Sequence, residues 1–257
     1  MPRANGKFIW YDVVTSDPPT AEFFYCDVIG WEAKDSELVD DYTVFHAGSQ
    51  RVGGILPMPE TAAMRSGWRG YIGVENVDLY AERLKAAGGI LYHGPADIPA
   101  VGRFAVCADP QGAVFILFKG AGDSVRHLAP VGTPGHVGWH ELHATASEQA
   151  FAFYEALFGW TKLETIEIGD AGPYRIFSMG DGQAGGMLIE TPQIPAPFWL
   201  YYFNVEAIAP ALERVRMDGG QVLNGPSPVP GGSLIAQCLD PQGAIFALVE
   251  PKHGSKS

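Results

Sequence analysis

An indole, a carboxylate and an imidazole alternate along one short stretch in the second half of the chain. Trp139, Glu141 and His143 are separated by single residues, in a run typical of a β-strand. Side chains two positions apart on a strand point to the same face, so all three are expected on one side of a sheet. A carboxylate beside an imidazole holds the ring in place for acid or base catalysis. We predict Glu141 and His143 as candidate catalytic residues and Trp139 as a flat wall for a ligand.

The same stretch allows other interpretations. His140-Glu141-Leu142-His143 is not a zinc motif, because histidines three apart on a strand face opposite sides and the helical H-E-x-x-H spacing is absent. Glu141 and His143 could instead share a metal with a donor from elsewhere in the chain. They could also be ordinary polar residues at a solvated strand end. These alternatives stay open from the sequence.

A similar pattern stands near the N-terminus. Trp10 is followed by Asp12 at the same spacing, and Val14 takes the place that corresponds to His143. We predict Trp10 and Asp12 as ligand-binding residues, although core packing explains the tryptophans equally well. Because the first stretch lacks the histidine, we expect the second half to be the working one.

These two stretches belong to an internal duplication with a period of about 130 residues, which is the length of a domain. Residues 10–31 align without a gap with residues 139–160, and Asp109-Pro110-Gln111-Gly112-Ala113 recurs letter for letter at 240–244. Further matches pair Gly53-Gly54 with Gly185-Gly186, Trp68 with Trp199, Tyr71 with Tyr202, and Gly94-Pro95 with Gly225-Pro226.

Each half is expected to contain two strand-helix-strand-strand-strand modules. Residues 8–15 are aromatic and β-branched, as in a strand, and Asp17 can cap a helix that ends at Gly30. The repeated Asp-Pro-Gln-Gly is expected to be a hairpin turn with a structural role only. The core-facing stripe of the first helix is expected to consist of Phe23, Phe24 and Val28.

This pattern predicts an α+β protein of two related domains. We place the first domain at residues 1–125 and the second at residues 137–257. Residues 126–136 lie in a Gly/Pro-rich stretch without apolar periodicity, and they are expected to form the linker.

The ordered blocks resemble the vicinal oxygen chelate superfamily of glyoxalases, bleomycin resistance proteins and extradiol dioxygenases. The resemblance covers nearly the whole chain and is closest to its two-domain, glyoxalase-like bacterial members. It implies paired modules whose curled sheets form cups, each cup binding a small molecule and a divalent metal. Three blocks carry the resemblance, and all three recur in the second half. In the first half they are Asp17 with Phe24-Tyr25 and Gly30-Trp31, then Val74-Glu75-Asn76-Val77 with Gly88-Gly89, then Asp109-Pro110-Gln111-Gly112.

The metal positions that the resemblance implies are mostly occupied by residues that cannot bind a metal. The first ligand position falls on Trp10 and Trp139, and the other two assigned positions fall on Arg69 and Leu200 and on Ile116 and Ala247. The fourth position lies within 53–58 and 185–190, where Glu190 alone offers an oxygen. Metals need several converging oxygen or nitrogen donors. We therefore predict no cofactor and disfavour a divalent metal.

The strand that opens each second module supplies further candidates. If the face of Arg69 and Leu200 lines the cup, then Tyr71, Tyr202 and Asn204 point into it as hydrogen-bond donors. Arg69 could hold a carboxylate or phosphate, although a lone arginine is more often a surface charge. We predict these four residues as ligand-binding.

Composition excludes several partners. The net charge of −12 and the lack of a Lys/Arg cluster argue against nucleic acid. The apolar runs are too short for a bilayer, and the N-terminus does not read as a secretion signal. Three cysteines without a Cys-x-x-Cys pair suit a reducing cytoplasm and suggest no redox role. A monomer or homodimer is expected.

Two functions stay open from the sequence. The chain could be an enzyme of the glyoxalase-like lyase, isomerase or dioxygenase-related kind, or a non-catalytic binder that sequesters an aromatic or apolar compound. A structural module that uses the acidic surface is a third possibility.

Overall fold

The computed structural model describes residues 5–59, 65–122, 129–168, 172–180, 182–189 and 196–252, which form four βαβββ modules. The first module comprises β1 (Phe8–Thr15), α1 (Pro18–Ile29), β2 (Glu32–Asp35), β3 (Thr43–Ala47) and β4 (Gln50–Pro57). The second comprises β5 (Gly67–Gly73), α2 (Val77–Ala86), β6 (Ile90–Ile98), β7 (Gly102–Ala108) and β8 (Val114–Gly120).

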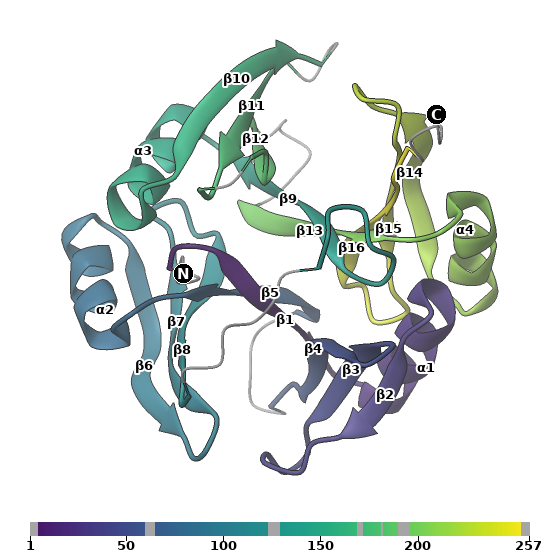
Figure 1. The fold of residues 1–257 in the computed structure, drawn as a ribbon, viewed down its shortest axis with the longest axis horizontal. Coiled ribbons are helices and arrows are strands. Elements are labelled where there is room, and N and C mark those ends of the chain that lie inside the picture. Colours follow the sequence, from purple (N-terminus) through teal and green to yellow (C-terminus); the bar gives the residue numbers. More distant parts are fainter. Residues whose placement is uncertain are drawn as a thin grey trace. The chain divides into compact units, whose positions relative to one another are not determined.

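The second half repeats this order (Figure 1). The third module comprises β9 (Val137–Ala144), α3 (Ser147–Phe158), β10 (Thr161–Glu167), β11 (Pro173–Ser178) and β12 (Gly185–Ile189). The fourth comprises β13 (Phe198–Asn204), α4 (Ile208–Met217), β14 (Gln221–Pro228), β15 (Leu234–Leu239) and β16 (Ile245–Glu250). The prediction of an α+β chain with four such modules is confirmed.

Each half of the sequence supplies one mixed, eight-stranded sheet. The strand orders are β2-β3-β4-β1-β5-β8-β7-β6 and β10-β11-β12-β9-β13-β16-β15-β14, which are the same order twice. The first and last strands of every module pair in parallel, as β9 does with β12, and the remaining pairs within a module are antiparallel. The strand that opens each module therefore lies inside its sheet, where its side chains can be positioned from both sides.

Contacts between Cα atoms divide the chain differently from the sheets. Unit 1 consists of residues 1–10, 69–127 and 139–200, and unit 2 consists of residues 11–68, 128–138 and 201–257. Each unit thus combines a module from the first half with a module from the second half. The boundaries of 1–125 and 137–257 describe the two sheets, and as domain boundaries they remain a proposal.

The predicted start and end of the first helix, α1, are both found in the structure. The side chain of Asp17 accepts a hydrogen bond from the amide of Thr20 at 3.2 Å, and Gly30 ends the helix with a left-handed φ of 85°. The expected core stripe needs one correction. Phe23 is 64% exposed and does not belong to it, whereas Phe24 and Val28 are fully buried.

A buried relay of hydrogen bonds links modules from different halves in each unit. In unit 1, Trp199 Nε1 donates to Tyr154 Oη at 3.0 Å, and Tyr154 donates to Asp109 Oδ2 at 3.2 Å. In unit 2 the corresponding relay of Trp68, Tyr25 and Asp240 has distances of 2.9 and 3.0 Å. Asp109 and Asp240 are the first residues of the repeated Asp-Pro-Gln-Gly turns. The turns are confirmed, and their aspartates also join the halves.

The glutamine of the first turn caps a helix of the other half. Gln111 Oε1 accepts from Thr145 Oγ1 at 2.6 Å and from the amide of Ala146 at 2.9 Å, just before α3. The residue at the N-cap of α3, Ala146, makes no side-chain cap bond, whereas α1 is capped by its own Asp17. Gln242, the matching residue of the second turn, has a buried Oε1 without a hydrogen-bond partner among the described residues.

This asymmetry predicts unequal effects of the same substitution. Gln111→Ala removes the bonds that hold the start of α3 and is expected to lower the free energy of unfolding by about 1.5 kcal/mol. Gln242→Ala is the matched control and should change it by less than about 0.5 kcal/mol. Urea denaturation followed by circular dichroism measures both values, and equal losses would contradict the assigned capping role.

Candidate functional site

Four side chains of unit 1 form a continuous line of hydrogen bonds in the second half. Trp139 Nε1 donates to Tyr174 Oη at 2.6 Å, and Tyr174 donates to Glu141 Oε2 at 3.0 Å. Glu141 Oε1 lies 2.9 Å from His143 Nε2. Glu141 and His143 are 5% and 7% exposed, so their contact is shielded from bulk water. The structure therefore brings together the three residues that the alternation predicted, through a tyrosine that it did not.

Strand alternation on β9 places these side chains on one face. Glu141 and His143 stand opposite Gly186 and Leu188 of β12 in the parallel register. His140 is on the other face, where its ring stacks on Phe8 at 4.6 Å and its Nδ1 lies 2.8 Å from the carbonyl oxygen of Ala184. The two histidines of the His140-Glu141-Leu142-His143 run thus have different surroundings, as expected.

Tyr174 reaches Glu141 because Gly186 has no side chain. A methyl group on Gly186 would overlap the ring of Tyr174, which comes from the neighbouring strand β11. The glycine of the repeated Gly-Gly pair is therefore the gap through which the tyrosine crosses β12 to the carboxylate of β9.

Unit 2 contains the corresponding arrangement from the first half. Tyr42 Oη donates to Asp12 Oδ1 at 2.6 Å, and a methyl group on Gly54 would overlap Tyr42. Asp12 is 1% exposed and stands opposite Gly54 in the register of β1 and β4. The duplication has kept tyrosine, acid and glycine, but Val14 takes the place of the histidine. Of the two arrangements, as far as the described residues show them, the second-half one pairs its acid with an imidazole.

The imidazole of His143 is also held by stacking. Its ring lies parallel to that of Phe198 on β13, with a centroid distance of 4.4 Å and an interplanar angle of 8°. Trp139 and Phe198 are each partly exposed. Two partly exposed aromatic rings beside a buried acid and imidazole can contact a planar ligand on its flat sides and supply polar groups at its edge.

His140 is a buried structural histidine. Burial lowers its pKa from the ordinary value to about 4, although its hydrogen bond to the carbonyl oxygen of Ala184 opposes the shift. The unfolded chain therefore binds a proton at this residue at a higher pH than the folded chain does, so His140 stabilises the fold above about pH 6.5 and this stabilisation is lost as the pH falls toward 4.

This shift predicts a measurable pH dependence. Between about pH 6.5 and pH 4, His140 should reduce the free energy of unfolding by on the order of 3 kcal/mol, at about 1.4 kcal/mol per pKa unit. His140→Gln should remove that part of the acid destabilisation, whereas His136→Gln, at a partly exposed histidine, should leave it unchanged. Denaturation curves across this range test the difference, and parallel pH profiles for wild type and His140→Gln would contradict it.

The remaining candidate residues lie as follows. Trp10, Arg69 and Tyr71 belong to unit 1; Trp10 and Arg69 are half-buried, while Tyr71 is buried opposite Ile116 and contacts Phe118 edge-on. In unit 2, Tyr202 Oη accepts from Gln237 Nε2 at 3.4 Å.

Asn204 has a structural setting in unit 2. Its Nδ2 donates to the carbonyl oxygen of Thr133 at 3.1 Å, and its backbone bonds to Gly135 and His136. Ligand binding by Trp10, Asp12, Arg69, Tyr71, Tyr202 and Asn204 remains a prediction.

The donor set does not fit the metal that the resemblance implies. Buried apolar residues occupy assigned positions, with Leu200 and Ala247 fully buried and Ile116 at 5% exposure. Glu190 lies outside the described residues. Within the described ranges, no group of three or more His, Cys, Asp or Glu side chains could hold a metal ion. In addition, both carboxylate oxygens of Glu141 already accept hydrogen bonds.

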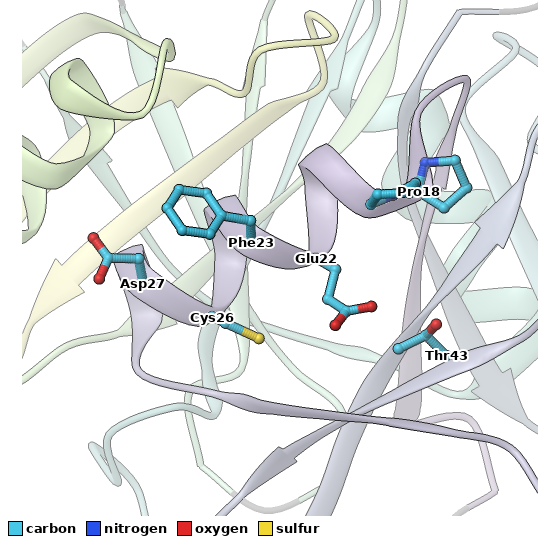
Figure 2. A pocket seen from close by; sticks show the side chains of 7 residues that line it. Pro18, Glu22, Phe23, Cys26, Asp27 and Thr43 are labelled. Atoms are coloured by element: carbon cyan, nitrogen blue, oxygen red, sulfur yellow. The ribbon is translucent and has the colours of Figure 1, made fainter.

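Two surface hollows lie at other residues. One, of about 640 Å³, runs along α1 in unit 2, where Figure 2 shows the Glu22 carboxylate and the Cys26 thiol turned toward the side on which Thr43 lies. Burial and the charge of Glu22 raise the pKa of Cys26 to about 11, so its thiol is a poor nucleophile. The other lies at the start of α2, beside Arg103. Neither is lined by Trp139, Glu141 or His143, so the candidate site rests on side-chain geometry.

Comparison with known families and curated proteins gives strong matches. The model of the Glyoxalase/Bleomycin resistance protein/Dioxygenase superfamily matches residues 7–117 and again residues 133–248. The "Putative glyoxylase CFP32" of Mycobacterium tuberculosis (strain CDC 1551 / Oshkosh) is 32% identical over 263 residues, covering 98% of both chains. The "Anthracycline biosynthesis protein DnrV" of Streptomyces peucetius is 30% identical and covers 98% of this chain and 95% of its own.

Solved structures share the fold at low identity. A single-residue variant of homoprotocatechuate 2,3-dioxygenase from B. fuscum has a TM-score of 0.67 at 14% identity, covering 97% of this chain and 72% of that chain. The Mn(II)-bound glyoxalase from Novosphingobium aromaticivorans has a TM-score of 0.64 at 18% identity, covering 96% and 81%. No helix in the described part of the chain has the length and apolar character needed to cross a membrane.

Proposed function

Because the chain belongs to the glyoxalase/bleomycin resistance protein/dioxygenase superfamily, we propose that it binds a small planar organic molecule and acts on it through Glu141 and His143. The observation that carries this proposal is the 2.9 Å contact between Glu141 Oε1 and His143 Nε2 in a buried, aromatic setting. An oriented imidazole next to a carboxylate can take up and return a proton. The proposed reaction class is a proton transfer within the ligand, as in a lyase or isomerase.

The proposal includes no metal. Three of the family's four ligand positions in each half hold residues that cannot coordinate one, and Glu141 is engaged by Tyr174 and His143. Elemental analysis of the purified protein should therefore find less than one equivalent of Zn, Ni, Mn or Fe. A stoichiometric metal whose removal abolishes binding or turnover would overturn this part.

A second function is non-catalytic sequestration of an aromatic compound. The loss of the family's metal positions favours it, and the name of a relative, an anthracycline biosynthesis protein, suggests which aromatic compounds to test. In this case Trp139 and Phe198 would hold the ligand, while the Glu141–His143 pair would only orient it. The partner is a small molecule in either case, and the free cysteines suit a reducing compartment such as the cytoplasm.

A two-step experiment separates these functions. A panel of planar aromatic compounds, with an anthracycline as its first member, is titrated while tryptophan fluorescence is followed, and each compound that binds is then checked for conversion by mass spectrometry. Trp139→Leu should weaken binding at least about tenfold through the loss of the indole.

His143→Gln distinguishes the two functions further. It should leave binding within a few-fold of wild type and lower turnover by about 100-fold if His143 is the acid/base group. His46→Gln, at a histidine of β3 in unit 2, is the control. Saturable binding without conversion supports sequestration, and the absence of saturable binding across the panel contradicts both functions.

A further inference from the structure

The hydrogen bonds of the candidate site have a fixed direction. An indole Nε1 carries a proton and has no lone pair to offer, so Trp139 can only donate to Tyr174. The hydroxyl of Tyr174 has a single proton, which is therefore directed to Glu141 Oε2. This follows from the distances of 2.6 Å and 3.0 Å along the line and from the chemistry of the donors.

The donor and acceptor of the next hydrogen bond, between Glu141 and His143, are fixed as well. Glu141 accepts from Tyr174 through one oxygen, and its other oxygen faces His143 Nε2 at 2.9 Å. A carboxyl group is a stronger acid than an imidazolium, so the proton between them belongs to the ring. Neutral His143 is then protonated on Nε2, and Nδ1 has the lone pair.

We infer that Trp139 and Tyr174 are positioning residues that fix, through Glu141, the tautomer of His143 in which Nδ1 is the proton acceptor. The inference rests on the proposed function for its purpose, since Nδ1 would be the atom that accepts a proton from the ligand. Under this inference Trp139 acts as a hydrogen-bond donor to Tyr174 as well as an aromatic surface for the ligand, and Tyr174 orients the carboxylate of Glu141.

The first-half arrangement supports a role for the tyrosine that is distinct from packing. Tyr42 bonds to Asp12 at 2.6 Å although the acid is one methylene shorter than Glu141. The tyrosine-to-carboxylate bond has thus persisted in both copies while the acid differs, and a glycine stands beneath the ring in each. Among the described residues of the two copies, it is the acid of the second, Glu141, that also contacts an imidazole, that of His143.

Replacing the acid by its amide tests the direction of the line. In Glu141→Gln, the oxygen of the amide must face the Tyr174 hydroxyl, because that hydroxyl still donates. The amide nitrogen then faces His143 Nε2 and donates to it, so the ring proton has to move to Nδ1. Nitrogen-15 NMR of the histidine rings at mildly alkaline pH reads the tautomer directly, with His143→Gln identifying the signal.

The expected results are specific. Wild type should show the Nε2-protonated form, and Glu141→Gln should shift the ratio of the two tautomers by about tenfold toward the Nδ1-protonated form, which corresponds to one hydrogen bond. Adding Tyr174→Phe or Trp139→Phe to Glu141→Gln frees the amide to turn over and should restore the Nε2-protonated form. Asp12→Asn, the matched change in the other copy, should leave the His143 signal unchanged.

Three outcomes would overturn the inference. They are a wild-type ring protonated on Nδ1, an unchanged tautomer in Glu141→Gln, and double variants that match the single variant. The wild-type measurement decides by itself if Glu141→Gln does not fold. Because the tautomer is read in the ligand-free protein, a failed ligand titration would count against the proposed function and leave this result standing.

Discussion

Asp109→Ala is expected to lower the free energy of unfolding by about 4 kcal/mol, since hydrogen bonds to a carboxylate are worth about 1.5 kcal/mol or more each. The carboxylate accepts from the amides of Gln111 and Ala113, both at 2.9 Å, and from the Tyr154 hydroxyl at 3.2 Å. Alanine would leave two buried donors and one part-buried donor without this acceptor. Burial also raises the pKa of Asp109, and the hydrogen bonds from Ala113, Gln111 and Tyr154 oppose this shift.

The second half provides the matched variant. Asp240 accepts from the amides of Gln242 and Ala244 and from Tyr25, so Asp240→Ala should have a similar effect in unit 2. Asp97→Ala, at an exposed acid, should cost less than about 1 kcal/mol even though it removes an ion pair with Arg103. Guanidinium denaturation measures all three. A loss below about 1 kcal/mol for Asp109→Ala would show that the relay contributes little to stability.

The repeated turn thus does more than reverse the chain. The proline and glycine of the turn suit its backbone, and the preceding aspartate bonds both to amides of its own turn and to a tyrosine of the other half. Tyr154 and Tyr25 are both fully buried, and burial together with the charge of Asp240 raises the pKa of Tyr25 well above its usual value. Tyr25 therefore keeps its hydroxyl proton, and in each unit the relay joins residues of the two halves.

Local sequence signals predicted much of the fold. β1 and α1 have the bounds that their residue types and caps indicate, because the Asp17 cap and Gly30 act over a few residues. β2 has no clear local signal, since Glu32–Asp35 is short, charged and mostly exposed at the edge of its sheet, without apolar alternation. Phe23 was misplaced because a helix with three adjacent aromatic residues cannot bury all of them against one surface.

Local sequence likewise predicts some residues of the candidate site and not others. Alternation along β9 was sufficient to place Trp139, Glu141 and His143 together, because the three lie on one strand. Tyr174 could not be found from local sequence, since it comes from β11 and reaches the acid over Gly186 of β12. The internal duplication does point to this tyrosine, because Tyr42 and Tyr174 occupy equivalent positions before the matching Gly-Gly pairs of the two halves.

Gly186→Ala is expected to abolish the function of the site while the fold survives. The added methyl group would overlap the Tyr174 ring, and relieving the overlap requires the ring to move away from Glu141. Overpacking of this kind costs about 2 kcal/mol of stability. We expect binding of any panel compound that saturates the wild type to weaken by about 100-fold, because the acid loses its orientation.

Gly54→Ala, the matched variant in the first half, separates the loss of stability from the loss of binding. It forces Tyr42 away from Asp12 by a similar overlap in unit 2, and the added methyl group would also lie 2.8 Å from the carbonyl oxygen of Thr43. Its cost in stability should therefore be at least as large, and thermal denaturation measures both variants. If the second-half arrangement is the working one, Gly54→Ala retains binding within a few-fold. Equal losses of binding in the two variants would mean that both copies serve the ligand. Because a glycine lies against a tyrosine in both copies, unequal binding in the two variants would assign the ligand to the second-half arrangement, in which the acid is a glutamate and the tyrosine accepts a hydrogen bond from Trp139.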